Sequence, residues 1–160
     1  MQSLRKLIGC PVFSFDSKRL GEVQDVCLDI GEAAVTGFIV SSPQESGGGT
    51  SGWAVRYADA MMDREAVIIG EEVSVAQLFD TNADSLGGHL LTKLLDKAVF
   101  TENGENLGEV DDVLYNPGDG KVAGYEVSAG ILADLVKGRV LRSINGIRKI
   151  AQDRIIVAER

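Results

Sequence analysis

One seven-residue pattern occurs twice in this chain, at LGEVQDV (Leu20–Val26) and LGEVDDV (Leu107–Val113), so the second copy begins 87 positions after the first. The flanking residues keep this offset without a gap, from CPVFSFDSKRLGEV over KAVFTENGENLGEV to VTGFIVS over VAGYEVS. Such self-similarity indicates a duplication, and two copies are too few for a solenoid. The sequence therefore predicts tandem domains of one fold, at residues 1–73 and 91–160, joined by a connector at 74–90.

Each copy has the composition and the turn signals of short β-strands. Runs rich in Val, Ile, Phe and Thr alternate with glycine and Asn or Asp turns. Strands are expected at Pro11–Phe15, Gly21–Asp29, Val35–Ser42, Gly52–Tyr57 and Ala66–Gly70, and at Ala98–Thr101, Gly108–Tyr115, Lys121–Ser128, Arg139–Arg142 and Arg154–Ala158. Five or six such strands in about 75 residues predict a small closed or nearly closed barrel. The expected fold class is mainly β, with two tandem small β-barrels.

The repeated motif predicts a bend in its own strand. Val23 and Val26 are three residues apart, whereas residues on one face of a strand lie at even spacing. Either the two valines face opposite sides or a β-bulge lies between them, and the glycine that opens each motif favours the bulge. Asp25 would then accept hydrogen bonds from nearby backbone amides. The predicted structural motif comprises Gly21, Val23, Asp25, Val26 and Gly37, and its second-copy equivalents Gly108, Val110, Asp112, Val113 and Gly124.

A helical pattern is expected in the connector. Ser74 is a candidate N-cap of SVAQLFD, with Gln77 three residues later. Further on, SLGGHLLTKLLDK carries a stripe of leucines, and a similar SLRKLIG precedes the first copy. We therefore expect a partly helical connector and a helical lead-in before each barrel.

The two copies differ most where the first carries the flexible loop SPQESGGGTSG. The second has AGILADLVKG there, whose spacing predicts a short helix with one apolar face. This helix either closes its own barrel or packs against the other copy, a second chain or a partner. The candidate interaction surface is Ile131, Leu132, Leu135, Val136, Arg139 and Arg142.

The repeated LGEVxDV, followed by V-x-G-[FY]-x-V-S, resembles the PRC-barrel domain. That domain is named after the cytoplasmic part of the photosynthetic reaction centre H subunit, and it also forms the C-terminal domain of bacterial ribosome-maturation factors. The resemblance covers both copies and implies a small all-β barrel that is used for docking. The motif belongs to the fold and brings no catalytic residue with it. We expect neither a membrane anchor of the H-subunit kind nor the additional RNA-related domain of the ribosome factors.

Charge, cysteines and hydropathy narrow the classes of function. The net charge of −8 argues against binding to the nucleic-acid backbone. From Lys121 onward, however, 8 basic residues outnumber 4 acidic ones. Cys10 and Cys27 match no zinc or redox spacing, and neither a secretory signal nor an apolar run of membrane-spanning length is present. We expect a cytoplasmic protein without membrane insertion.

The sequence offers no catalytic, cofactor or metal constellation. Its single histidine, His89, is interpreted as a surface residue at a helix end. The acids Glu109, Asp111 and Asp112 lack the spacing of a calcium loop, and GDGK at Gly118–Lys121 is not a P-loop. Trp53 is either a recognition anchor or a core residue, and its alignment with Val140 favours the core.

The leading hypothesis is a non-enzymatic adaptor that docks to a protein partner and needs no cofactor. A homodimer is one arrangement compatible with this hypothesis. The first alternative is a ribosome- or RNA-associated factor that uses the basic C-terminal region, Arg139, Arg142, Arg148, Lys149 and Arg154. The second alternative is a small-molecule or metal-binding protein, which requires a pocket with convergent titratable groups.

Overall fold

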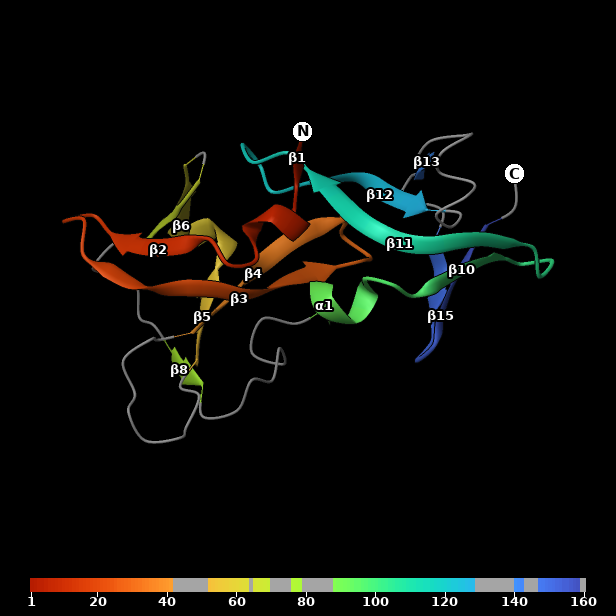
Figure 1. Cartoon of the computed structure of the whole chain (residues 1–160), viewed down its shortest axis with the longest axis horizontal. Coiled ribbons are helices and arrows are strands. Elements are labelled where there is room, and N and C mark those ends of the chain that lie inside the picture. The colour runs from red at the N-terminus through yellow and green to blue at the C-terminus, as the bar shows by residue number, and fades with distance from the viewer. Residues whose placement is uncertain are drawn as a thin grey trace.

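The computed structural model describes residues 1–41, 52–63, 65–69, 76–78, 88–128, 140–142 and 147–158 of the chain. Within them, each copy forms one sheet to which the other copy adds a two-residue strand, and the two halves lie side by side along the long axis of the molecule (Figure 1). The expected mainly-β fold built from two copies is confirmed.

The first copy forms a sheet in the order β6-β7-β2-β3-β4-β5-β8, in which only β2 and β7 run parallel. It is preceded by β1 (Gln2–Ser3) and the 3-10 turn η1 (Arg5–Leu7), and a second 3-10 turn, η2 (Tyr57–Asp59), joins β5 to β6. Its strands are β2 (Pro11–Ser14), β3 (Arg19–Asp29), β4 (Ala34–Ser41), β5 (Gly52–Arg56), β6 (Ala60–Met62), β7 (Val67–Ile69) and β8 (Ala76–Leu78).

The second copy forms a sheet in the order β13-β12-β11-β10-β15-β14, with β10 and β15 parallel. It is preceded by β9 (His89–Leu90) and the helix α1 (Leu91–Leu94). Its strands are β10 (Ala98–Thr101), β11 (Asn106–Tyr115), β12 (Val122–Ser128), β13 (Val140–Arg142), β14 (Ile147–Ile150) and β15 (Arg154–Val157). Elements β1 to β7 of the first copy thus recur in the second copy at the 87-residue offset. In both described sheets the strands pair along an open path rather than in a closed ring.

The helix expected over SVAQLFD is wrong, because Ala76–Leu78 form the strand β8. This strand pairs with Gly52–Ala54 of β5 and so satisfies backbone groups at an edge that would otherwise be unpaired. In the part of the predicted leucine segment that the structure describes, from residue 88 onward, only Leu91–Leu94 are helical and His89–Leu90 are extended. The expected N-cap Ser74 and the apolar group Ile131, Leu132, Leu135 and Val136 lie outside the described residues.

Both copies contribute to one continuous hydrophobic core. A single cluster of buried side chains includes Val12 and Phe38 from the first copy and Val99 and Tyr125 from the second. Small domains bury a low share of their surface, so two units of this size gain by sharing a core. The sharing is made at the junction, where η1 and α1 lie between the two sheets (Figure 1).

Candidate interaction site at the junction of the two copies

The junction is built from contacts that occur in pairs, related by the 87-residue offset. Strand β1 pairs with β11 of the other copy, and β9 pairs with β3. The starts of β4 and β12 meet in an Ala34–Lys121 bridge. Around it, Val35 donates its N–H to the carbonyl of Gly120, and Val122 donates to that of Ala33, both at 2.8 Å. The two copies are therefore arranged as in a twofold dimer, with the same patch used on both sides.

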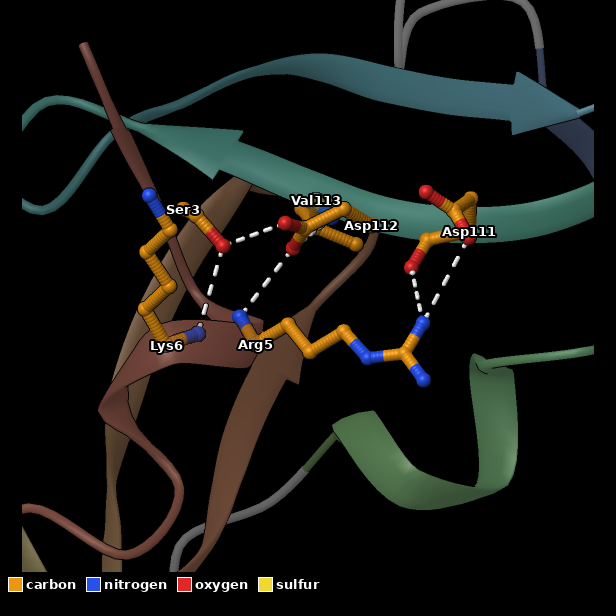
Figure 2. A network of polar contacts seen from close by, with 6 residues as sticks. All are labelled: Ser3, Arg5, Lys6, Asp111, Asp112 and Val113. Atoms are coloured by element: carbon orange, nitrogen blue, oxygen red, sulfur yellow. Dashed lines mark hydrogen bonds and ion pairs between the residues drawn. The ribbon is translucent and has the colours of Figure 1, made fainter.

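Asp112, from the second LGEVxDV motif, holds the lead-in of the first copy. Its carboxylate accepts hydrogen bonds from the backbone N–H of Arg5 at 3.0 Å, from the Ser3 hydroxyl and from the N–H of Val113 at 2.7 Å (Figure 2). Only 8% of Asp112 is exposed. The guanidinium of Arg5 also donates to the carbonyl of Asp111 at 2.9 Å.

Asp25 makes the equivalent contact in the other direction. It is 7% exposed and accepts from the N–H of Val26 at 2.8 Å and of Thr92 at 3.1 Å, and from the Thr92 hydroxyl. The backbone donors Arg5 and Thr92 are 87 residues apart, but the hydroxyl comes from Ser3 in one case and from Thr92 in the other. The carboxylate position is thus kept in both copies while its hydroxyl donor has moved.

The β-bulge expected in the motif is present in both copies. The register shifts between Val23 and Asp25 in β3, and between Val110 and Asp112 in β11. Each aspartate bonds the next amide of its own strand, as the sequence suggested, and also reaches across to the other copy. Gly21 is required because a Cβ there would lie 2.0 Å from the carbonyl oxygen of Ser41.

Aromatic side chains fill the centre of the junction. The Tyr57 hydroxyl donates to the carbonyl of Pro117 in the other copy at 2.6 Å. Its ring packs on Phe38 and meets Tyr115 edge-on, with centroid distances of 5.8 and 6.5 Å. Burial, and then the nearby Asp119, raises the pKa of Tyr57. This cluster joins the first sheet to the β11–β12 turn.

Tyr115 makes the stability of the protein sensitive to alkaline pH. Burial, and then Tyr57 and Cys10, raises the pKa of its hydroxyl to about 12, above the value of about 10 for an unfolded chain. Between these values the folded state binds more protons, so this contribution is present below pH 10 and falls by about 2 to 3 kcal/mol as the pH rises through 12.

We expect Tyr115→Phe to reduce this alkaline loss, as measured by urea unfolding at pH 8 and pH 11. At pH 8 the variant should be as stable as wild type or slightly more stable, because the buried hydroxyl has no hydrogen-bond partner among the described residues. A clear loss at pH 8 would show that the hydroxyl is bonded.

Described residues line a hollow on each of two sides of the junction. The first, of about 490 Å³, lies beside the Asp112 contact and is lined by residues such as Lys6, Cys10 and Leu114. The second, of about 690 Å³, is lined by the start of β4, by η2 and β6, and by the Pro117–Asp119 turn of the other copy. We call the second hollow the junction groove. Its most exposed large apolar side chain is Met61, which is 58% exposed.

A sequence model of the PRC-barrel domain matches residues 1–71 and 87–160. The chain belongs to the PRC-barrel domain family. The two matched segments each contain one LGEVxDV motif, so each copy of the duplicated sequence corresponds to one PRC-barrel domain. No curated protein matches the chain.

The polar candidates of the sequence are spread over both PRC-barrel copies. His89 is exposed in β9, immediately before α1. Of the three acids, Glu109 is exposed, Asp111 pairs with Arg5 at 3.5 Å and Asp112 is buried at the junction. No group of three or more metal-ligating side chains occurs among the described residues, and no described helix is long and apolar enough to cross a membrane.

The basic candidates are described only in part. Arg148 pairs with Glu102 at 3.4 Å, and Arg154 pairs with Asp153 while its guanidinium lies 4.8 Å from the centre of the Phe100 ring. Lys149 is exposed in β14. Arg142 is in β13, but its side chain is not described, and Arg139 lies outside the described residues, as does the apolar group that ends at Val136.

The junction groove was not anticipated from the sequence. Trp53, which was weighed as an anchor, pairs in β5 with Val40, just as Val140 pairs with Val127 in β13. These pairings confirm that Trp53 and Val140 occupy equivalent positions in the strands of the two copies. One feature of the sequence could have drawn attention to Met61 and Met62. In the alignment of the two copies they lie opposite Arg148 and Lys149, so the copies differ in chemistry at this place.

Proposed function

We propose that this PRC-barrel protein is a non-enzymatic interaction module that binds a protein partner in the junction groove. The observation that carries the proposal is the groove itself, which has the volume of a ligand site and is lined mainly by apolar side chains. Exposed methionine adapts to varied partner shapes. Because both copies form its walls, the groove depends on the tandem arrangement.

The chemistry of the described side chains supports docking rather than catalysis. Burial raises the pKa of the Cys27 thiol to about 12, so this group stays protonated and unreactive. Both cysteines are free, which agrees with a reducing compartment, and we include a cytoplasmic location in the proposal. The RNA-binding alternative is less supported, because Arg148 and Arg154 already have acidic partners.

Affinity capture from the native lysate tests the proposal, with wild type compared with Met61→Lys. The substitution places a charge in the groove at an exposed position, so it should abolish capture of the partner without unfolding the protein. Phe15→Lys is the matched control, because Phe15 is 62% exposed and lies outside the groove. Equal capture by all three proteins would exclude the groove as the binding site.

A further inference from the structure

We propose that the occupant of the junction groove is strand β14 of a second copy of this chain, which adds to the outer edge of β6. This inference rests on the proposed function and names its partner. It predicts head-to-tail association, because the two surfaces that meet are different.

Strand β6 has an outer edge beside the groove that pairs with no other described strand. It is the end strand of its described sheet and pairs only with β7. The N–H of Asp63 bonds the carbonyl of Ala66 at 3.0 Å, and hydrogen-bonded and non-hydrogen-bonded pairs alternate along an antiparallel ladder. The neighbouring residue in the strand, Met62, therefore directs its N–H and C=O away from β7. An incoming extended strand can pair with these groups, as in strand addition to a sheet edge.

Strand β14 is the equivalent end strand of the second sheet, where β15 is its only partner among the described strands. It is extended over Ile147–Ile150, with the sequence IRKI, and its two basic side chains are exposed. By the offset, Arg148 and Lys149 occupy the places of Met61 and Met62. The two related edges have therefore diverged, one to methionine and the other to cations.

The charge of the groove is complementary to Lys149 of this strand, whereas Arg148 already pairs with Glu102 at 3.4 Å. Arg56 in the groove wall is paired with Asp59 at 3.2 Å. Asp119, on the opposite wall, has no ion pair among the described residues. Arginine and lysine bury their aliphatic stems on apolar surface while their charged ends reach an acid. In the junction groove, Met61 and Met62 provide the apolar surface for such a stem, and Asp119 provides the acid for its charged end.

Analytical ultracentrifugation of the purified full chain over a concentration series tests the proposal. Wild type should associate as the concentration rises. Met61→Lys should weaken association about tenfold or more, because it places a cation against the basic strand, and Lys149→Glu should do the same, because it places an acid against the carboxylate of the groove. Both positions are exposed, so thermal unfolding should confirm that the variants fold.

An equimolar mixture of the two variants is the decisive sample. One contact in it joins the unaltered β6 edge to the unaltered β14. The other contact joins the two substituted strands, where the introduced lysine meets the introduced glutamate. Association should therefore return to near the wild-type level, whereas an interface in which β6 does not meet β14 never brings the introduced lysine to the introduced glutamate and predicts no recovery.

Two results would overturn the inference. One is a mixture that stays monomeric, and the other is a wild type that is monomeric at its highest concentration. If such a wild type still captures a lysate protein through Met61, the proposed function stands without this inference.

Discussion

Asp112→Ala is expected to lower the free energy of unfolding by about 3 kcal/mol, because it leaves one buried and one partly buried backbone amide without an acceptor. These amides belong to Arg5 and Val113, and they bond the carboxylate at 3.0 and 2.7 Å. The Ser3 hydroxyl loses its acceptor as well. A small protein has roughly 5 to 15 kcal/mol of stability, so the loss should be evident in urea unfolding.

Asp111→Ala is the neighbouring control. Its ion pair with Arg5 is partly exposed, with 51% of the Arg5 side chain and 23% of the Asp111 side chain accessible, so we expect a change of about 0.5 kcal/mol or less. Hydrogen exchange locates the effect of Asp112→Ala. The amides of Leu4 and Arg5 should lose protection, whereas that of Thr92, held by Asp25, should keep it. A uniform loss at all three amides would contradict a local anchor.

Gly88→Ala is expected to cost about 3 to 4 kcal/mol, the second large effect, because it combines left-handed strain with forced separation of β9 from β3. Gly88 has φ of +82°, and a Cβ there would lie 2.0 Å from the carbonyl oxygen of Leu28 and 2.7 Å from its carbonyl carbon. Backbone cannot move aside as the end of a side chain can.

Gly104→Ala separates these two causes. Gly104 has φ of +88°, but a Cβ there would meet nothing within 4 Å. We expect this variant to lose only about 1 kcal/mol, through conformational strain. Thermal or urea unfolding of both variants gives the difference between them, which measures the close approach of β9 to β3. Equal losses would mean that this approach adds nothing.

Much of the fold could be predicted because the same pattern of strands and turns occurs twice in the sequence. Strands β2, β3 and β4 and their counterparts follow from runs of β-branched residues that recur at one offset. Strands β6 and β14 were missed because they are short and carry methionine or basic residues rather than a typical β pattern. Strand β8 was predicted as helix because its pairing with β5 outweighs the local preference of Ala-Gln-Leu.

The site was less predictable, because it depends on which copy each segment contacts. The bulge at Asp25 and Asp112 follows from glycine and valine spacing within one strand. Nothing in that spacing shows that Arg5 or Thr92, 107 and 67 residues away, would donate to these carboxylates. The junction groove likewise brings Met61 and Asp119 together from different copies, which only the arrangement of the sheets reveals.

The reciprocal anchoring of the lead-in segments also bears on how the protein unfolds and evolves. Each half supplies the aspartate that fastens the other, so loss of either half releases a segment of its neighbour. We therefore expect the duplicated chain to melt in a single cooperative transition rather than in two steps. Deletion of either repeat would remove the aspartate that fastens the lead-in of the other, so we expect selection to keep the two repeats together.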